Sequence, residues 1–273
     1  MKGIIVILGV FCIMFALYVS HRLLYSEPFV SPNKTLCIYV VYEKNDQYRD
    51  NIRYFSKNAI LPTVDYIFVV NGDLTVELPR GPNIRHMFRE NKGYDFGAWG
   101  DALRFVNIEH YSYFMFINTS VRGPYKGQCG ENWIQAFTSL ITKDVKLAGT
   151  TINIFRLNPI KPHVQSMNFA TDKEGLALLM KEGIFDPVPE TYSFNDLIYN
   201  REIRMSTKIL EHGWNITCIP KKYQNINYRV IKEDINPTSI NGDFHFPNRY
   251  FGRSLTKDEL IFYKTERFSP ETM

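Results

Sequence analysis

Glu90-Asn91-Lys92-Gly93-Tyr94-Asp95-Phe96-Gly97-Ala98-Trp99-Gly100-Asp101-Ala102-Leu103 is the stretch that decides the expected fold. An apolar run with strand character, residues 84–88, leads into it, and apolar residues at helical spacing follow it. A strand that ends in such a turn and continues into a helix exposes backbone N–H groups and the positive end of a helix dipole. We therefore expect an anionic ligand here, with Gly93 and Gly97 letting the backbone approach it closely.

Asp95 is placed like the N-cap of this helix, so capping alone and contact with a ligand are both open interpretations. The glycine spacing differs from the dinucleotide fingerprint G-x-G-x-x-G. A Rossmann dehydrogenase is therefore not indicated.

The segments around this turn predict a mostly parallel α/β sheet covered on both faces. Continuous apolar runs at residues 36–42 and 66–70 are typical of buried parallel strands, and residues 51–60 between them have a helical pattern. Strand, helix and strand make the βαβ unit of a nucleotide-binding sheet. Residues 113–117 form a further buried strand in this prediction.

The second half of the chain predicts more helices and strands of the same domain. Helical spacing is present at 133–141, 173–181 and 193–213, and residues 145–154 are expected to form a strand. Thr171 or Asp172 is expected to cap the helix at 173–181. The aromatic tail at 243–267 is expected to pack over the sheet, so residues 35–273 are predicted to form one domain.

The N-terminus predicts a membrane anchor. An apolar run without internal charge covers residues 4–19, and residues 1–24 are read as an uncleaved signal anchor followed by a short stem at 25–34. A cleaved signal peptide is the competing interpretation, although no small-x-small site closes the run. The sequons at Asn33 and Asn215 are compatible with a lumenal body.

Composition bounds the function further. The formal net charge is only +4, no basic block stands out, and no electrostatic footprint for nucleic acid is present. The four cysteines contain no C-x-x-C pair, which excludes a zinc knuckle and a redox motif of that kind.

The turn Glu90-Asn91-x-Gly93-x-Asp95-x-Gly97-Ala98, followed by a helix, resembles the sugar-nucleotide-binding turn of GT-A glycosyltransferases. The resemblance is closest to relatives of the rhamnan-synthesis rhamnosyltransferases and to a related eukaryotic and viral group. It extends from about Thr35 to Arg267 through four further segments: Phe116-Ile-Asn-Thr-Ser-Val-Arg-Gly-Pro124, Val145-Lys-Leu-Ala-Gly-Thr-Thr151, Pro162-His-Val-Gln-Ser-Met167 with Ala170-Thr-Asp172, and Glu259-Leu-Ile-Phe-Tyr-Lys264.

This resemblance implies a nucleotide-diphospho-sugar transferase fold and a nucleotide-sugar donor. The loop after the second strand would contact the base or ribose, although a plain Asn-Gly turn is the alternative there. The residues expected to bind the donor are Asn71, Asp73, Asn91, Gly93, Asp95, Gly97, Asn118, Ser120 and His163.

Asn118-Thr119-Ser120 stands where many GT-A enzymes carry Asp-x-Asp to hold a divalent metal. Asn and Ser oxygens are neutral and are poor ligands for a hard cation, so no metal ligand is assigned. Either a Mn or Mg ion is held weakly or elsewhere, or Arg122 neutralises the leaving phosphates with its planar guanidinium. A tight strand exit without a ligand is the third interpretation.

Glu202, within the predicted helix at 193–213, is at the place where related enzymes carry an acid near the acceptor. We expect Glu202 to act as the catalytic carboxylate, with Asp196 and Asp186 as rivals and a solvated surface role as the alternative. His163 is expected to contact the substrate, and His245 could reach the active site from the tail.

The sequence thus predicts a glycosyltransferase that moves a sugar from a nucleotide sugar to a glycan or glycoconjugate acceptor. A catalytically silent sugar-binding or assembly subunit is the alternative, supported by the missing Asp-x-Asp. A methyltransferase would need a glycine-rich loop after the first strand, which Tyr42-Glu-Lys-Asn-Asp does not supply. The expected location is a single-pass type II protein with its body in the Golgi or ER lumen, or a viral protein acting in its host.

Overall fold

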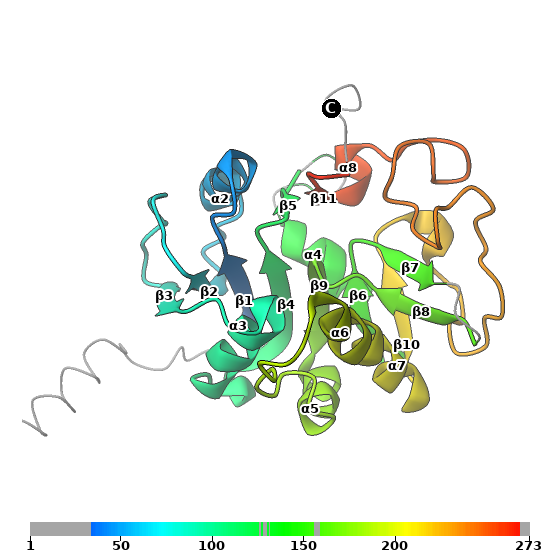
Figure 1. Ribbon diagram of the computed structural model, residues 1–273, viewed down its shortest axis with the longest axis horizontal. Coiled ribbons are helices and arrows are strands. Elements are labelled where there is room, and N and C mark those ends of the chain that lie inside the picture. Colours follow the sequence, from blue (N-terminus) through cyan, green and yellow to red (C-terminus); the bar gives the residue numbers. More distant parts are fainter. Residues whose placement is uncertain (1–33, 126, 128–129, 131, 156–158, 268–273) are drawn as a thin grey trace, which may run out of the picture. The chain divides into compact units, whose positions relative to one another are not determined.

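Residues 34–125, 127, 130, 132–155 and 159–267 are described in the computed structural model (Figure 1). The predicted signal anchor at residues 1–24 and the Asn33 sequon lie outside the described residues. Among the described helices, none combines the length and the apolar character that crossing a bilayer requires. The described residues all belong to one compact unit.

A central sheet of seven strands confirms the predicted mostly parallel α/β architecture. Its order is β10-β6-β9-β4-β1-β2-β3, and β9 alone within this sheet runs antiparallel to its neighbours (Figure 1). The strands are β1 (Lys34–Val41), β2 (Val64–Asn71), β3 (Ile84–Arg89), β4 (Tyr111–Asn118), β6 (Val145–Gly149), β9 (Asn168–Asp172) and β10 (Asn215–Cys218).

Helices cover both faces of this sheet. In Figure 1, α2 (Asp46–Asn58) and α4 (Trp133–Thr138) lie above it, and α3 (Tyr94–Arg104), α5 (Lys173–Lys181) and α7 (Arg204–Glu211) lie below. The remaining helical elements are η1 (Ile108–His110), α6 (Phe194–Leu197), the π-helical η2 (Ile198–Ile203), η3 (Lys221–Tyr223) and α8 (Lys257–Leu260). Two small antiparallel sheets complete the fold. In one, β5 (Val121–Arg122) pairs with β11 (Tyr263–Lys264), and in the other, β7 (Ile152–Phe155) pairs with β8 (Lys161–Val164).

The core explains why the strands are continuously apolar. On the α2 side, Tyr39 of β1 stacks on Phe55 with ring centroids 4.0 Å apart. On the other side, Phe116 of β4 stacks on Phe169 at 4.8 Å, and Trp99 of α3 meets Phe116 edge-on at 5.7 Å. Burying each such ring contributes about 2–3 kcal/mol, and a paired arrangement adds about 0.5–1.5 kcal/mol.

Helix ends follow side-chain caps, some of which the sequence pattern did not reveal. α2 begins at Asp46 rather than at residue 51, because the side chain of Asn45 accepts a hydrogen bond from the Tyr48 N–H. Asp172 is the cap of α5, accepting from the Gly175 N–H at 2.9 Å. The strand predicted at 145–154 is two strands, since the chain turns after Gly149 and continues as β7.

The N-cap prediction for Asp95 was wrong. Gly93 is the N-cap of α3, with φ +69°, and makes no side-chain cap hydrogen bond because it has no side chain. Asp95 lies two residues after this cap, in the first turn of the helix. Its carboxylate is therefore available for contacts outside the helix.

The Asn215 sequon cannot carry a glycan in this fold. Asn215 is buried in β10, its amide nitrogen donates to the Ile226 carbonyl at 2.7 Å, and its oxygen accepts from the Tyr228 N–H at 3.0 Å. A glycan there would require breaking both bonds, so this sequon gives no support for a lumenal body.

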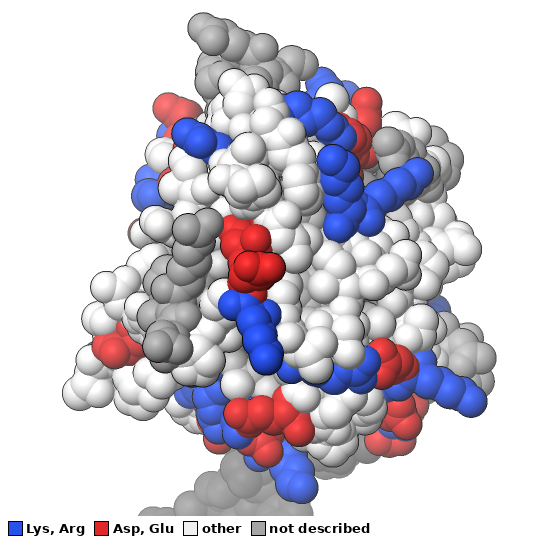
Figure 2. Space-filling model, turned by 90° about the vertical axis from the view of Figure 1, so that its right-hand side faces the viewer, with Lys and Arg blue, Asp and Glu red and all other residues white. Residues whose placement is uncertain are grey.

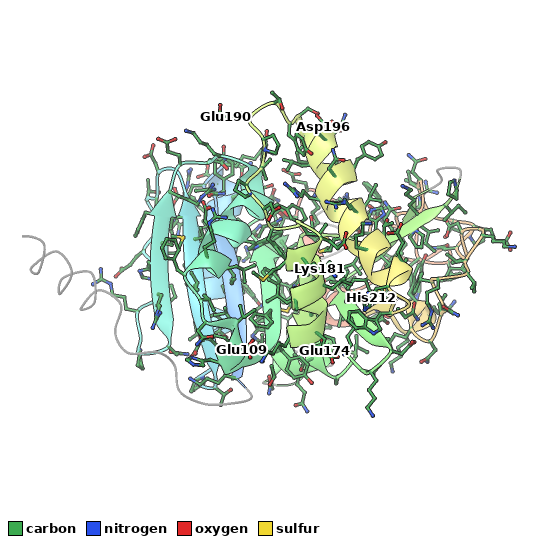
Figure 3. All side chains as sticks on the ribbon, turned by 90° about the horizontal axis from the view of Figure 1, so that it is seen from below. Glu109, Glu174, Lys181, Glu190, Asp196 and His212 are labelled. Atoms are coloured by element: carbon green, nitrogen blue, oxygen red, sulfur yellow. The ribbon has the colours of Figure 1, made fainter. Side chains whose placement is uncertain are left out.

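The order in which strands are added to the sheet reverses between β1 and β4: β2 and β3 follow on one side of β1, and the parallel strand β4 lies on the other. In open α/β sheets ligands bind outside the carboxyl ends of the strands at such a switch point. Figure 3 shows both edges: Glu109, just before β4, and Glu174 lie at the amino edge, whereas Glu190 and Asp196 lie at the carboxyl edge. The loop before α6 and the start of α6 therefore border the expected ligand region.

Figure 2 shows the side of the molecule that carries β7 and β8. Blue and red side chains form small separate groups there, divided by white surface. No continuous surface of one charge is visible on this face.

The aromatic tail packs onto the body beside the exit of β4. β11 pairs with β5, the Thr265 N–H donates to the Ser120 carbonyl at 3.2 Å, and the Asn51 amide donates to the Thr119 carbonyl at 2.9 Å and to the Thr265 hydroxyl at 3.2 Å. Residues about 140 positions apart are thus joined at one edge of the sheet, which confirms that the tail packs over it.

Candidate functional site

A cavity of about 520 Å³ lies at the carboxyl edge of the sheet, where β1 and β4 end. Its size is within the range of small-molecule and cofactor sites. Its lining comes from six parts of the chain: the β1 exit (Tyr42, Lys44, Tyr48), the start of α3 (Tyr94, Asp95, Phe96), the β4 exit (Asn118, Thr119, Ser120), the loop before β9 (Gln165, Ser166, Met167), α6 with η2 (Phe194, Leu197, Ile198, Glu202) and the C-terminal segment (Lys264, Glu266, Arg267).

Asp95 faces this cavity from the first turn of α3. Burial raises the pKa of its carboxyl group to about 6, while a hydrogen bond from the Asn118 amide, at 2.7 Å, and the nearby Lys264 charge act in the opposite direction. Glu202 raises this pKa further. A carboxyl group with a pKa near neutrality in a cavity is typical of a functional residue.

The β4 exit is a closed hydrogen-bond network. The Asn118 oxygen accepts from the Ser120 N–H at 3.0 Å and from the Ser120 hydroxyl at 2.6 Å. The Thr119 hydroxyl donates to the Val40 carbonyl and accepts from the Tyr42 N–H. These bonds fix the strand exit against β1 and orient the Asn118 amide toward Asp95.

Glu202 is oriented by the loop before β9. Its Oε2 accepts from the Ser166 N–H at 2.7 Å and from the Ser166 hydroxyl at 2.5 Å. Its Oε1 lies 3.7 Å from Nε2 of His163, whose Nδ1 lies 3.0 Å from the Lys161 carbonyl oxygen. The structure thus brings Glu202, Asp95, Asn118 and Ser120 together in the cavity lining. His163 is buried and contacts Glu202, but it does not line the cavity.

The π-helical segment η2 presents Glu202 and its neighbour Arg201 to different surroundings. The buried Arg201 guanidinium donates to the carbonyls of Gly183, Asp186 (3.3 Å) and Pro187 (3.4 Å). One residue of η2 therefore anchors the loop after α5, and the next residue lines the cavity.

Asn71, Asp73 and Asn91 do not line the cavity. Asn71 is buried, and its oxygen accepts from the Arg89 guanidinium at 2.7 Å, so this side chain braces the turn between β3 and α3. Asp73 and Asn91 are exposed. The plain-turn interpretation fits the loop after β2 better than a contact to the donor.

Glycines 93 and 97 are needed for packing within the protein. A Cβ at Gly97 would lie 2.5 Å from the Lys92 carbonyl oxygen, and one at Gly93 would lie 2.7 Å from Cβ of Val188. The space that we expected to be left for a ligand at these positions is thus occupied by the turn itself and by the loop after α5.

Arg122 is also absent from the cavity lining. It ends β5, where it pairs with Tyr263 of β11, and its guanidinium lies over the Tyr54 ring at 4.6 Å. The structure therefore does not bring Arg122 to this cavity, because the backbone after Ser120 places Arg122 against the Tyr54 ring of α2. Its role as a phosphate clamp stays a prediction. Asp196 binds Ser193 in a capping box, and Asp186, like Asp196, does not line the cavity.

The cations of the cavity come from parts of the chain that sequence reasoning did not select. Lys264 and Arg267 belong to the C-terminal segment, and Lys44 follows β1. Lys264 is the last residue of Glu259–Lys264, one of the segments that resemble GT-A glycosyltransferases. That resemblance is the one sequence signal that could have indicated Lys264 as a site residue. His245 was expected to reach the active site. It is buried, and its Nε2 accepts a hydrogen bond from the Lys264 N–H at 3.1 Å, so it helps to hold the backbone of the C-terminal segment in place.

The described residues do not fit a divalent metal at the β4 exit. Both acceptor sites of the Asn118 oxygen are used by Ser120, and the Glu202 Oε2 is used by Ser166. Nowhere in the described part of the chain do three His, Cys, Asp or Glu side chains gather as a metal site. A hard divalent cation prefers several carboxylate and water oxygens, which this donor set does not supply.

The fold and the cavity define a class: α/β proteins that hold a ligand at the switch point of a mostly parallel sheet. Within that class, the family model described as rhamnan synthesis protein F (RgpF) matches residues 67–236, and the chain belongs to this family. The match confirms the predicted resemblance to the rhamnan-synthesis group, and it agrees with the prediction of a glycosyltransferase.

Among curated proteins, the chain is 25% identical over 178 residues to virulence protein VirA of Vibrio anguillarum (strain ATCC 68554 / 775), covering 55% of this chain and 54% of VirA. The chain thus spans about half the length of the curated relatives it matches.

Two solved glycosyltransferases are among the structural relatives. The mannosyltransferase PcManGT from Pyrobaculum calidifontis, in complex with GDP-Man and Mn2+, has a TM-score of 0.41 at 13% identity, covering 74% of this chain and 60% of that one. A glycosyltransferase involved in the glycosylation of the major capsid of PBCV-1 has a TM-score of 0.37 at 11% identity, covering 62% of this chain and 75% of that one.

Proposed function

We propose that this protein is a glycosyltransferase that moves a sugar from a nucleotide-sugar donor to a glycan or glycoconjugate acceptor. Membership of the rhamnan synthesis family supports this class of reaction. The observation that carries the proposal is the cavity at the β1/β4 switch point, which joins two carboxylates, Asp95 and Glu202, at the place where α/β sheets hold nucleotides.

Sugar transfer is displacement at an anomeric carbon. It needs charge compensation for the departing diphosphate and, when the configuration is inverted, a carboxylate that takes the proton of the acceptor hydroxyl. Glu202 suits the second task. Ser166 holds its Oε2 in place, and no described residue donates a hydrogen bond to Oε1, which lies 3.7 Å from Nε2 of His163.

Three aromatic side chains in the lining are exposed and suit the flat faces of a base or a sugar. Tyr42, Tyr94 and Phe194 are 40%, 47% and 61% exposed, and the Tyr94 and Phe194 rings meet edge-on at 6.0 Å. Exposed rings beside a polar cavity bury apolar surface when a ligand stacks on them. We assign them to binding of the donor or acceptor.

The test is a panel of nucleotide sugars, measured by thermal shift and by release of the nucleotide in the presence of candidate acceptors. A donor that binds the folded state raises the melting temperature by mass action. Glu202→Gln should keep this shift and lower turnover by about 10²–10⁴-fold, as expected for loss of a general base. Glu211→Gln, on the exposed part of α7, is the matched control and should turn over normally.

A Glu202→Gln enzyme with normal turnover would remove Glu202 from the mechanism. Binding of a nucleotide sugar without any transfer in the wild type would instead favour a silent sugar-binding subunit. No observation on the described residues favours that second function.

We further propose that residues 1–24 anchor the protein in a membrane and that the body acts in the lumen of the Golgi or ER. The support is the uncharged apolar run at residues 4–19. Deleting residues 1–27 should move the protein from the membrane pellet to the supernatant after cell fractionation. A full-length protein that fractionates with the supernatant would contradict the anchor.

A further inference from the structure

We propose that Lys264 and Arg267 of the C-terminal segment hold the diphosphate of the donor, in the place where a metal-clamped enzyme would use a divalent cation. This inference rests on the proposed function and assigns the anion site within the same cavity. Two side-chain cations supply the same formal charge as one divalent ion, and a nucleotide diphosphate is the anion that such a pair would bind.

The backbone of this segment is fixed beside the β4 exit. Lys264 pairs with Val121 across the β11–β5 ladder, its N–H donates to Nε2 of His245, and the next N–H donates to the Ser120 carbonyl. These bonds hold the Lys264 backbone in register with the strand exit. The cations are therefore preorganised, which is a requirement for electrostatic stabilisation of a leaving group.

The Lys264 ammonium forms no hydrogen bond or ion pair within the described part of the chain. It is half-buried and lines the cavity. Burial, and after it the repulsion from Arg267, lowers the pKa of this ammonium, while the charges of Glu202, Glu266 and Asp243 act in the opposite direction. A half-buried cation without an ion pair costs folding free energy, and an anion in the cavity would offset that cost.

Arg267 has one ion-pair partner within the described part of the chain. One guanidinium nitrogen, Nη1, forms an ion pair with Asp243, and the guanidinium lies 5.1 Å from the centre of the Phe246 ring. Asp243 is itself fixed by the Gln165 amide at 3.0 Å and by the His245 N–H at 2.8 Å. The remaining donors of a planar fork suit phosphate oxygens.

Lys208 of α7 is the matched control, because its ammonium carries the same charge but does not line the cavity. It forms an ion pair with Glu211 at 2.9 Å. The competing interpretation of Lys264 is structural: it would only balance the charge of Asp95 and Glu202. That interpretation predicts a loss of stability on removing Lys264, whereas an anion site predicts an unchanged or higher melting temperature without ligand.

The experiment uses the full chain, in detergent if it fractionates with membranes, and three probes: UDP, GDP and dTDP, each compared with its monophosphate in excess EDTA. Affinities are measured by thermal shift and by titration calorimetry for the wild type, Lys264→Gln, Lys264→Arg, Arg267→Gln and Lys208→Gln. Adding Mn²⁺ in place of EDTA supplies the comparison with a metal clamp.

The expected result is that at least one diphosphate binds the wild type in EDTA more tightly than its monophosphate. Lys264→Gln and Arg267→Gln should each weaken the diphosphate at least 10-fold and the monophosphate much less. Lys264→Arg should retain most of the affinity, and Lys208→Gln should change it less than 3-fold. Unliganded Lys264→Gln should melt at or above the wild-type temperature.

Three results would overturn the proposal: a diphosphate that binds only with Mn²⁺, normal diphosphate affinity in folded Lys264→Gln, or equal losses for both kinds of nucleotide. In each of these the nucleotide still binds, so the proposed function survives. If no nucleotide or nucleotide sugar binds the wild type under either condition, the proposed function fails, and the anion site fails with it.

Discussion

Replacing Asp95 with asparagine should stabilise the protein at neutral pH and reduce its activity. The substitution keeps an oxygen that can accept the hydrogen bond from Asn118, at 2.7 Å in the wild type, and removes the charge. A carboxylate held in a cavity at a cost to the fold is expected of a residue retained for function.

The magnitude follows from the pKa of this carboxyl group. Burial raises it from 3.8 to about 6, so the folded state binds this proton more tightly than the unfolded state does. Stability therefore falls as the pH rises from about 4 to about 6, and the full cost is present above about pH 6. Two pKa units correspond to about 3 kcal/mol at neutral pH.

The assay is urea unfolding of both proteins at pH 3.5 and at pH 7.5. Asp95→Asn should raise the free energy of unfolding by about 3 kcal/mol at pH 7.5 and by almost nothing at pH 3.5, where the wild-type carboxyl is protonated in both states. Asp46→Asn, an exposed acid in the first turn of α2, is the control and should change stability by less than about 1 kcal/mol. An Asp95→Asn variant that is less stable at pH 7.5, or equally stabilised at both pH values, would refute the reasoning.

Three further outcomes are expected. Phe116→Ala should lower the free energy of unfolding by about 3–5 kcal/mol in urea titrations, because this ring is fully buried and stacked on both sides; a loss under about 1 kcal/mol would contradict the packing. Gly97→Val should lower the melting temperature even without ligand, because its side chain would meet the Lys92 carbonyl at 2.5 Å; a normally stable variant that only loses donor binding would restore the ligand-space interpretation. Glu43→Gln should accelerate hydrogen exchange at the Val76 N–H at pH 7. Burial alone would raise the pKa of the Glu43 carboxyl, but its hydrogen bonds to Val76 and Thr75 outweigh burial and lower the pKa from 4.5. The wild type should therefore show the same acceleration only below about pH 4, and unchanged exchange in the variant would contradict the prediction.

The sheet could be predicted from the sequence because its signals are local. Strands buried on both faces give uninterrupted apolar runs, and the predicted ends of β1, β2 and β4 lie within one or two residues of the observed ones. Helix starts were less accurate, because a cap such as Asn45 is recognised by a single hydrogen bond rather than by a repeating pattern.

Part of the site could also be predicted, because the signals of those residues are local in the sequence. Asp95, Asn118, Ser120 and Glu202 lie at ends of strands or on a helix, and the order of these elements places them in the cavity. Lys264 reaches the cavity through pairing of β11 with β5, which is far away in sequence and leaves no periodic signal. Arg122 does not line the cavity, because the direction of a side chain after a strand exit depends on contacts such as the Tyr54 ring, which sequence spacing does not reveal.

The π-helical segment η2 has a consequence for how this chain could have changed over time. A π-turn holds one residue more than a regular helical turn, so a single-codon insertion into an ordinary helix can create it. Here the surplus residue lies between the cap at Ser193 and the regular helix α7, in the segment that contains Arg201 and Glu202. A one-codon deletion would turn the upstream part of the helix by about 100° relative to α7, so Arg201 and Glu202 could no longer both keep their partners. Relatives that differ by one residue here would then be expected to differ in chemistry while sharing the same sheet.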